Sequence, residues 1–352
     1  MMSEWKTYKL SELVEIKYGK DHKHLADGVI PVYGSGGIMR FAETHLYDRE
    51  SILIPRKGTL SNLFYLDKPF WSVDTMFYTK IKNGVHGKYL YYLLKSMDLA
   101  SMNVGSAVPS LTTEVLNKVE ISLPDLPTQR QIAQILTSLD DKIELNLQMN
   151  QTLEAMAQAI FKEWFVDFNF PGFDGELVDG LPKGWRVEKL ANVCTVKYGK
   201  DHKHLDDGDI PVYGSGGIMR YAEKALYERE SILIPRKGTL TNLFYVTEPF
   251  WSVDTMFYTI INEDCIRKYL FYLLKTLNLA SMNVGSAVPS LTTEVLNKID
   301  IVVPEYGLLQ EFENSISTFY SKMDVNNQQI KSLTQTRDTL LPKLMSGQLE
   351  VV

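Results

Sequence analysis

The sequence predicts an α+β protein in which two mixed α/β domains are each followed by a long helix, in a repeat with an offset of 180 residues. Three observations lead to this prediction: long runs that recur, short β-rich segments punctuated by glycine turns, and two stretches with a heptad pattern of apolar residues. The chain has 352 residues, which is enough for two or three domains with their own cores at ~100–200 residues per domain.

The repeat is clearest at residues 99–118, a run of 20 that recurs unchanged at 279–298. Residues 5–123 and 185–303 are nearly the same, whereas 126–165 and 306–345 share a pattern but few identities. Units of this length are domains and not solenoid turns. We therefore expect a first mixed domain, a central long helix, a linker, a second mixed domain, and a C-terminal long helix with its tail, at residues 1–125, 126–170, 171–184, 185–305 and 306–352.

Within each mixed domain the pattern predicts short strands and two helices. Residues 51–54 and 63–66 are rich in β-forming side chains, and glycines at 34–37 and 58 mark turns. Leu90, Leu93 and Leu94 share one face of a helix predicted from Lys88 to about residue 99. A second helix is expected to begin near Thr112.

The two long segments predict helices with a continuous apolar seam. From Ile132 to Trp164, and from Phe312 to Leu344, the residues at alternating steps of four and three are apolar or Asn, except for Arg337. Thr128 and Gln131 predict a capping box, and Pro342 is expected to kink or end the second helix. Each seam can pack on its own domain or on the other helix. Asn146 and Asn326 occupy equivalent seam positions, and buried Asn at such positions commonly sets the register of paired helices.

The composition is that of a globular protein in a reducing compartment. The N-terminus is polar, and no apolar run approaches the ~18–20 residues that cross a bilayer, so we expect a cytoplasmic protein without a membrane segment. Cys194 and Cys265 stand where the first copy has Val14 and Val85, which favours buried apolar side chains over a disulfide or a nucleophile. The net charge is −6, which implies weak non-specific binding to DNA unless partners add basic surface.

Several phrases resemble the specificity subunits of type I restriction-modification systems. They are LPDLPTQRQIA at residues 123–133, LDDKI at 139–143, IFKEWFVDF at 160–168 and LLPKLMSG at 340–347. IPRKG at 54–58 and PFWSVDT at 69–75 are similar to one common type of target-recognition domain in that family. The resemblance covers essentially the whole chain, and the phrases are specific in combination.

The resemblance implies a fold and a set of partners. The two long helices would form an antiparallel coiled coil that separates two target-recognition domains, each reading half of a bipartite site in double-stranded DNA. Two modification subunits, which bind S-adenosylmethionine and methylate adenine N6, would dock on the chain. Restriction subunits that hydrolyse ATP with Mg²⁺ would complete the nuclease. The chain itself would be non-catalytic and would bind no cofactor.

One feature departs from the family pattern, because here the recognition domains match and the helices have diverged. Two equal readers related by a two-fold axis predict a DNA target that is an interrupted palindrome. A helix from Thr128 to about Phe165 would be ~57 Å long, against ~34–36 Å for one turn of DNA. The helix pair would therefore leave a gap of unread base pairs between the half-sites.

Candidate DNA contacts are donors and acceptors on predicted loops, since specific reading takes place at base edges in the major groove. Arg can bond a guanine edge twice, Asn can do the same at adenine, and Lys on a loop more often holds phosphate. In the first copy the candidates are Lys20, Lys23, Ser35, Arg40, Arg56, Lys57 and Asn62. In the second copy they are Lys200, Lys203, Ser215, Arg220, Arg236, Lys237 and Asn242. Residues 103–111, glycine-rich and polar, form either a loop near DNA or a packed connection.

Other chemistry is weakly indicated. His22 and His24 with Asp21 form a poor metal pattern, and residues 34–39 lack the third glycine of a dinucleotide fingerprint. An Asn/Asp-Pro-Pro-Tyr phrase, typical of adenine methyltransferases, is missing from the sequence. Three hypotheses remain: a non-catalytic targeting subunit of a DNA methyltransferase and nuclease, a stand-alone sequence-specific DNA-binding regulator, and an enzyme whose site has escaped notice. Copurification with an S-adenosylmethionine-binding partner would separate the first from the others.

Overall fold

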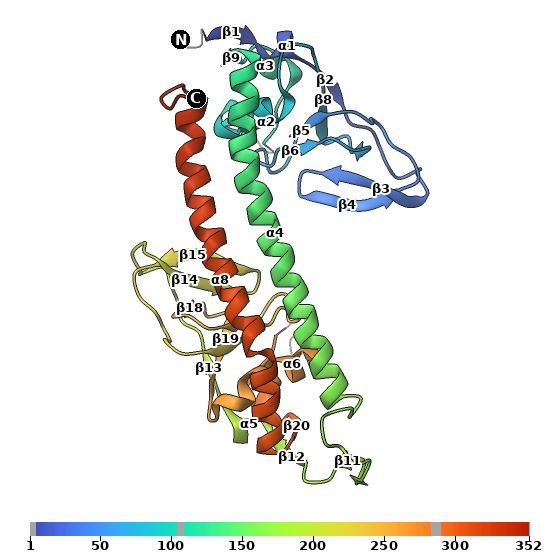
Figure 1. Ribbon diagram of the computed structural model, residues 1–352, viewed down its shortest axis with the longest axis vertical. Coiled ribbons are helices and arrows are strands. Elements are labelled where there is room, and N and C mark those ends of the chain that lie inside the picture. The colour runs from blue at the N-terminus through green and yellow to red at the C-terminus, as the bar shows by residue number, and fades with distance from the viewer. Residues whose placement is uncertain (1–4, 104–108, 283–289, 352) are drawn as a thin grey trace. The chain divides into compact units, whose positions relative to one another are not determined.

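The computed structural model describes residues 5–103, 109–282 and 290–351. It divides into two compact units: the first contains the chain up to Leu147 and again from Asn326 onward, and the second is Gln148–Val325. Two long helices of 40 residues are α4 (Leu126–Phe165) and α8 (Tyr306–Met345) (Figure 1). Each of them lies partly in the first unit and partly in the second. Each unit therefore combines one copy of the repeated globule with parts of both long helices, which confirms the predicted α+β class.

The globule of the first unit precedes α4 in the chain. Its elements are β1 (Lys6–Lys9), α1 (Leu10–Leu13), β2 (Val14–Tyr18), β3 (Asp27–Gly34), β4 (Gly37–Ala42), β5 (Ser51–Pro55), β6 (Phe64–Leu66), β7 (Trp71–Ser72), β8 (Met76–Ile81), α2 (Gly87–Ser96), the 3₁₀ helix η1 (Leu99–Met102), α3 (Thr113–Asn117) and β9 (Glu120–Leu123). The strands and helices that the sequence predicted correspond to β5, β6, α2 and α3. Thr112 accepts a hydrogen bond from the N–H of Val115 as the N-cap of α3.

The globule of the second unit repeats this order. Its elements are β12 (Arg186–Lys189), α5 (Leu190–Val193), β13 (Cys194–Tyr198), β14 (Ile210–Gly214), β15 (Gly217–Ala222), β16 (Ser231–Pro235), β17 (Phe244–Val246), β18 (Trp251–Ser252), β19 (Met256–Ile261), η2 (Asp264–Ile266), α6 (Arg267–Thr276), η3 (Leu279–Met282), α7 (Thr293–Asn297) and β20 (Asp300–Val303).

In the first globule, β5 separates two apolar cores. It lies within the sheet β2-β8-β5-β6, beside a second sheet ordered β4-β3-β7. Successive side chains on a strand point to opposite faces, so Ile52 and Ile54 join the core under α2 while Leu53 joins the core with Val32 and Trp71. The strand is buried along its whole length. This double-sided burial explains why residues 52–55 are apolar without the alternation of a half-exposed strand.

In the first unit, α4 and α8 pair with opposite directions. Arg337 forms an ion pair of 2.8 Å with Asp140, and Asn146 Nδ2 donates to Gln329 Oε1 at 3.1 Å. As the residue number rises along α4 it falls along α8, so the pairing is antiparallel (Figure 1). In the second unit Trp164 and Phe165 of α4 pack on Phe312 of α8, with ring centroids 6.0 and 5.0 Å apart.

The seam residues of the long helices pack against two neighbours, the other long helix and a globule. Asn146 and Asn326 are 1% and 0% exposed, as expected for seam positions. Leu344 and Met345 of α8 also belong to the core of the first globule, and Phe161 of α4 to that of the second. Both interpretations of the heptads are therefore correct in part, because each helix packs on its partner helix and on a globule.

Two predictions about the helix ends were wrong. The N–H of Thr128 bonds to Asp125 Oδ1 at 2.9 Å, so Asp125 caps α4 and the expected Thr128–Gln131 box is not the cap. Pro342 does not end α8, since the helix runs to Met345 and Ser346 N bonds to the carbonyl of Pro342 at 3.0 Å; a kink at Pro342, the other outcome expected, stays a prediction. Pro342 lies on the exposed side of the helix, where water can satisfy the carbonyl that its missing N–H leaves free.

The predicted linker carries a small hairpin of its own, formed by β10 (Leu177–Val178) and β11 (Leu181–Pro182). Phe170 stacks on Trp185 with ring centroids 5.6 Å apart, which anchors the start of the second copy. Among the described helices, none combines the length and apolar character needed to cross a membrane.

Candidate DNA interface

Two loops of the first globule are fastened together around Ser35. Asn62 Nδ2 donates to the carbonyl of Ser35 at 3.0 Å. Gly58 has φ of +89°, and a Cβ there would lie 2.8 Å from Ser35 Oγ. Glycine is therefore required at 58 both for its backbone conformation and for close approach. The turn between β3 and β4 and the loop after β5 form one surface.

Arg56 lies on the same surface and is held in a fixed orientation. Its guanidinium stands over the ring of Tyr18, 5.4 Å from the centroid, and Nη1 donates to the carbonyl of Asp74 at 3.2 Å. A guanidinium has five N–H donors, and the contacts of the described residues use one of them. The rest of this half-buried fork remains able to bond a base edge or a phosphate.

Lys57 is exposed beside Arg56 and marks where a third loop joins this surface. It forms an isolated β-bridge with Ser110, and Leu111 N bonds to the carbonyl of Arg56 at 2.9 Å. Asn103 Oδ1 accepts from Ser110 N at 2.7 Å. Both flanks of the glycine-rich stretch 103–111 are thus anchored at the Arg56 loop, while its residues 104–108, and 283–289 in the second copy, lie outside the described residues.

Lys20 and Lys23 are exposed on a segment held next to β7. Trp71 Nε1 donates to the carbonyl of Lys20 at 3.0 Å, and Lys20 N bonds to the carbonyl of Ser72 at 2.9 Å. A Cβ at Gly19 would collide with the carbonyl of Val73. The loop with the two lysines therefore has a defined position near Asp74, the residue that also holds Arg56.

Arg40 is the predicted residue that the structure ties most firmly to its own domain. Its Nη2 forms an ion pair of 2.7 Å with Asp27 and donates to the carbonyl of Leu25 at 3.0 Å. Arg220 repeats the arrangement with Asp207 and Leu205. The structure thus shows Arg40 as a link between β4, the first residue of β3 and the segment before it. To read a base it would have to give up these bonds.

The second globule has the same surface, with nearly all of the same contacts. Asn242 Nδ2 donates to the carbonyl of Ser215 at 3.0 Å, and Arg236 stands 5.4 Å over the ring of Tyr198. Lys237 bridges to Ser290, and the carbonyl of Lys200 accepts from Trp251 at 3.0 Å. We call the two sets the reading surfaces; they contain Tyr18, Lys20, Lys23, Ser35, Arg56, Lys57, Asn62 and Asp74, and Tyr198, Lys200, Lys203, Ser215, Arg236, Lys237, Asn242 and Asp254.

Tyr18 and Asp74 were missed by the sequence analysis, although each lies within a run that recurs unchanged. So were Ile38 and Met39 of β4, two large apolar side chains that are 52% and 59% exposed. The available signal was that all four residues lie in runs that recur unchanged. Residue type alone pointed only to the polar members of the surface.

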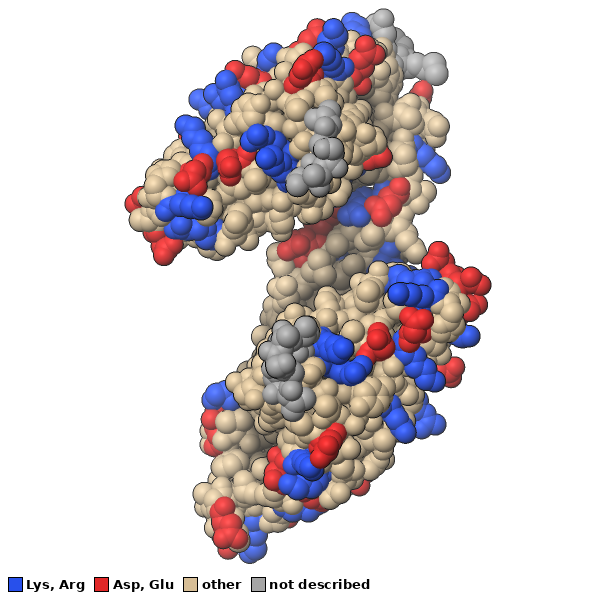
Figure 2. Space-filling view, turned by 180° about the vertical axis from the view of Figure 1, so that it is seen from behind, with Lys and Arg blue, Asp and Glu red and all other residues tan. Residues whose placement is uncertain are grey.

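Charge on the described surface is mixed. On the face drawn in Figure 2, lysines and arginines are interspersed with acidic residues over each unit and form no broad basic field. This agrees with the net charge of −6. Such a surface favours contacts at a few positions over a strong non-specific attraction to phosphates.

The cysteines and histidines offer little chemistry. Cys194 is buried, and burial raises the pKa of its thiol to about 12, so it is protonated at neutral pH. Cys265 is also buried, and desolvation raises its pKa as well. This confirms the expected buried apolar character of both residues. In residues 5–103, 109–282 and 290–351, no three His, Cys, Asp or Glu side chains are grouped so as to hold a metal ion.

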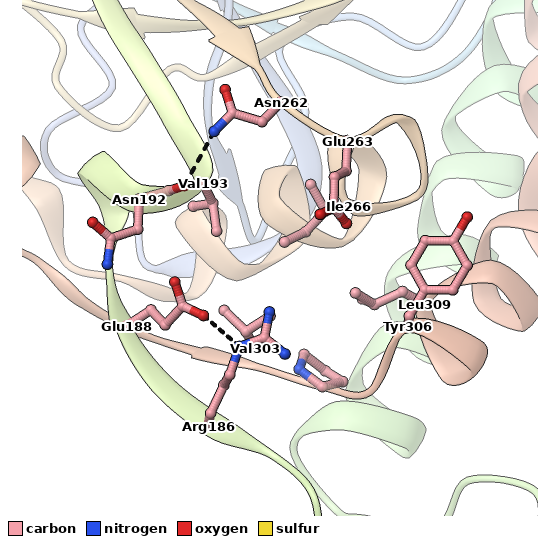
Figure 3. A pocket seen from close by; sticks show the side chains of 11 residues that line it. Arg186, Glu188, Asn192, Val193, Asn262, Glu263, Ile266, Val303, Tyr306 and Leu309 are labelled. Atoms are coloured by element: carbon pink, nitrogen blue, oxygen red, sulfur yellow. Dashed lines mark hydrogen bonds and ion pairs between the residues drawn. The ribbon is translucent and has the colours of Figure 1, made fainter.

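A small pocket of about 260 Å³ lies in the second unit beside β12 and the start of α8 (Figure 3). Arg186, Glu188, Asn192 and Glu263 line its polar side. Ligand pockets are usually ~300–1,000 Å³. The first copy has Lys6, Tyr8, Glu12 and Asn83 at the equivalent positions. Because the lining changes between the copies, the pocket is not part of what the two globules share.

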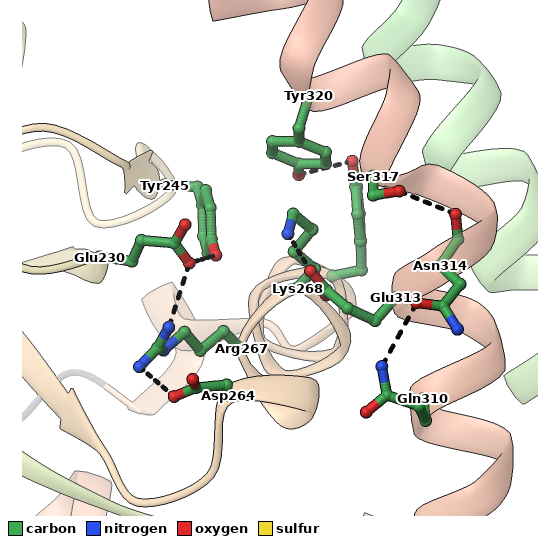
Figure 4. Close-up of polar contacts among 11 residues, drawn as sticks. Glu230, Tyr245, Asp264, Arg267, Lys268, Gln310, Glu313, Asn314, Ser317 and Tyr320 are labelled. Atoms are coloured by element: carbon green, nitrogen blue, oxygen red, sulfur yellow. Dashed lines mark hydrogen bonds and ion pairs between the residues drawn. The ribbon is translucent and has the colours of Figure 1, made fainter.

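A buried polar cluster also belongs to the second unit alone (Figure 4). Lys268 of α6 is paired with Glu313 of α8 and lies 5.0 Å from the ring of Tyr320. Close by, Tyr245 donates to Glu230 at 2.6 Å. At the positions equivalent to Glu313 and Tyr320 the first copy has Ala133 and Asp140. The cluster joins a globule to a long helix and lies apart from the reading surface.

The sequence is similar to a family of known proteins. The model of the type I restriction modification DNA specificity domain matches residues 2–155 and 182–335. The chain is 29% identical over 306 residues to the type I restriction enzyme MjaIX specificity subunit of Methanocaldococcus jannaschii, covering 77% of this chain and 71% of that protein. It is 24% identical over 359 residues to the HindI specificity subunit of Haemophilus influenzae, and the match covers 76% of this chain and 78% of that protein.

The fold also matches a solved structure. The crystal structure of a type I restriction-modification S subunit from M. genitalium superposes with a TM-score of 0.65 and 18% identity, over 97% of this chain and 96% of that one. The family model covers most of both copies, and the reading surfaces lie inside the matched residues. The chain therefore belongs to the family of type I restriction-modification specificity subunits, with two DNA-recognition domains.

Proposed function

We propose that each globule reads one half of a bipartite site in double-stranded DNA, and that the two halves are the same sequence in inverted orientation. The observation that supports this is the recurrence of the reading surface, in which Arg56 and Arg236 both stand 5.4 Å over a tyrosine ring. Equal surfaces bind equal base sequences. Readers related by a two-fold axis meet the strands of a duplex in opposite directions, so the target is an interrupted palindrome.

Within each surface the chemistry assigns roles. Arg56 bonds a guanine edge with the free part of its fork, and Tyr18 keeps the fork in plane. Asn62 uses one amide hydrogen on Ser35, which leaves its other hydrogen and its carbonyl for an adenine edge. Lys20 and Lys23 hold phosphates and position the globule. In the second globule Arg236, Asn242, Lys200 and Lys203 take the same roles.

The chain acts as a targeting subunit within a larger enzyme. Two modification subunits carry S-adenosylmethionine and methylate adenine N6, and restriction subunits carry ATP and Mg²⁺. The mixed surface charge supports this division, because partners that add basic surface would supply the phosphate contacts that a net charge of −6 leaves weak. α4, at 40 residues, is about 60 Å long and serves as the spacer that sets the unread gap.

The first test is a map of adenine methylation in the host genome, compared with a strain that lacks this chain. We expect one methylated motif to disappear, and that motif to be an inverted repeat with a central gap. Two unrelated half-sites would contradict the palindrome. Tight specific binding by the isolated chain, without a copurifying S-adenosylmethionine-binding partner, would instead favour a stand-alone regulator.

The second test uses Arg56→Ala and Arg236→Ala. Each should weaken binding to the mapped site by about 1–3 kcal/mol, and the two losses should be equal because the half-sites are equal. The double variant should lose about the sum, since distant sites add. Lys118→Ala is the matched control, because Lys118 is an exposed cation paired with Glu114 outside the reading surface. Unequal losses in a gel-shift or anisotropy titration would argue against equal readers.

A further inference from the structure

The hairpin that carries Ser35, and its copy in the second globule, each have two large exposed apolar side chains. Ile38 and Met39 of β4 are 52% and 59% exposed, and Ile218 and Met219 of β15 are 47% and 60% exposed. Single exposed apolar residues are common on protein surfaces. Exposure alone therefore assigns these side chains no role. The evidence for a role comes from the comparison between the copies and from the residues that the side chains contact.

The comparison between copies separates these residues from another exposed apolar one on the same hairpin. Val29 of β3 is 84% exposed, and its counterpart in the second copy is Asp209. The hairpin thus tolerates a charge at that position. Residues 30–40 recur without change as 210–220, so Ile38 and Met39 have been kept apolar while Val29 has not.

Met39 contacts the turn that carries Ser35. A Cβ placed on Gly34 would lie 2.5 Å from Met39 Sδ, which shows that the thioether rests against the backbone immediately before Ser35. Asn62 bonds to the carbonyl of Ser35, the next residue of the same turn. The apolar side chain and the polar readers are therefore parts of one continuous surface.

The surroundings favour DNA over a protein as the partner of this apolar group. Arg56, Lys57 and Lys20 are exposed or half-exposed on the same surface, whereas the buried cores of protein–protein interfaces are depleted of charge. In the major groove, the apolar feature that a side chain can contact is the C5-methyl group of thymine. Met is unbranched and adapts its shape to such a small target.

We propose that Met39 and its copy Met219 contact thymine methyl groups in each half-site, next to the bases read by Arg56 and Asn62. This inference rests on the proposed function, since it requires that the reading surface binds DNA. It adds a class of base contact that the arginines and asparagines do not make. It predicts at least one thymine in each half-site whose methyl group contributes to affinity.

The experiment uses the complex of this chain with its modification subunits and a duplex that contains the mapped site. Each thymidine is replaced in turn by deoxyuridine, which removes only the methyl group. We expect one or two positions in each half-site at which affinity falls about three- to five-fold, the effect of one buried methyl group. In the double variant Met39→Ala/Met219→Ala, affinity for the normal duplex should fall and the difference between thymidine and deoxyuridine should vanish.

Control variants separate the possible outcomes. Val29→Ala should leave the affinities for the thymidine duplex and for the deoxyuridine duplex unchanged. Met39→Leu/Met219→Leu should still bind the deoxyuridine duplex more weakly than the thymidine duplex. Arg56→Ala/Arg236→Ala should weaken both duplexes equally. If the arginine variant weakens binding but no deoxyuridine does, or if a half-site has no thymine in either strand, the methyl contact is overturned and the proposed function stands. If the arginine variant has no effect, the proposed function itself fails.

A protein partner would give another result. Because Met39 and Met219 are mostly exposed, the alanine variants should melt at the temperature of the unaltered chain. Loss of copurification with the modification subunits in these variants, with the deoxyuridine response absent from the unaltered complex, would place a protein on this surface and overturn the inference.

Discussion

The two globules keep one surface and have changed another. On the reading surfaces, Asn62 and Asn242 make the same bond at the same 3.0 Å. Toward the long helices, the first globule uses a buried Gln129, whose Oε1 accepts from His86 N at 2.9 Å. In the second globule the equivalent residues are Leu309 and Ile266, both buried.

The reverse exchange occurs nearby. Lys268 and Glu313 form a buried pair in the second unit, where the first has Lys88, half-buried, and Ala133. At Gln129 the first copy has a polar residue where the second has the apolar Leu309. At Ala133 the first copy has an apolar residue where the second has the charged Glu313. The difference teaches that the reading surface is independent of the attachment to the helices. Each globule is fitted to its own helix segments: the equivalent lysine is buried and paired where the helix supplies Glu313, and half-buried over the ring of Tyr65 where the helix has Ala133.

The largest effect is expected from removing residues 340–352. Leu344 and Met345 are 1% and 7% exposed in the core of the first unit, and loss of each such side chain costs about 2–5 kcal/mol. A domain is stable by only about 5–15 kcal/mol, so the first unit should unfold while the second remains folded. Hydrogen exchange should show lost protection in residues 5–147 and retained protection in 148–325.

Two variants serve as controls for the truncation. Removing only residues 348–352 leaves Leu344 and Met345 in place and should preserve the first unit. Phe161→Ala, at a side chain buried in the second unit, should produce the opposite pattern of lost protection. Equal loss in both units after either change would contradict a division into two cores.

A smaller effect is expected from Lys268→Met. Breaking a buried ion pair from one side typically costs about 3–5 kcal/mol, because the remaining charge has no partner, whereas replacing both partners is often neutral. The double variant Lys268→Met/Glu313→Leu should therefore recover most of the stability in denaturant titrations. Lys88→Met in the first globule is the matched control and should change stability little. An equal loss in the single and double variants would show that the pair is not the cause.

The smallest effect concerns pH. Burial lowers the pKa of His86, and its Nδ1 accepts a hydrogen bond from Tyr89 N as the N-cap of α2. The unfolded chain therefore binds a proton at this residue more readily than the folded one, so the contribution of His86 falls as the pH drops below about 6.5, the ordinary value for His. His86→Ile, which installs the residue of the second copy, should reduce the loss of first-unit stability between pH 7 and 5. An unchanged pH profile in thermal unfolding would count against this role.

Much of the fold could be predicted because its signals are local or periodic. The repeat defined the two globules, and the heptads from Ile132 to Trp164 and from Phe312 to Leu344 gave the long helices without reference to tertiary contacts. The helix ends were predicted less well. Asp125 and Thr128 both suit a cap, and which one is used depends on where β9 delivers the chain. Pro342 is tolerated because it is exposed, and the sequence does not show exposure.

The candidate site was predicted by residue type and missed where partners are distant in sequence. Arg56 and Asn62 stood out as donors on a glycine turn. Arg40 had the same appearance, yet the register of β3 with β4 brings Asp27 to it from 13 positions earlier. Tyr18 becomes part of the surface only because β2 and β8 are neighbours in the sheet. Such contacts depend on strand order, which the pattern along a single strand does not contain.

The division of the long helices has a consequence for synthesis on the ribosome. The second unit is one continuous stretch, Gln148–Val325, whereas the first needs residues from Asn326 onward to complete its core. The N-terminal globule therefore emerges first but waits, with the apolar faces around Ile132 and Leu136 uncovered, until the final turns of α8 arrive. We expect nascent chains stalled before residue 326 to bind chaperones through the first globule, and the second unit to mature earlier although it is made later.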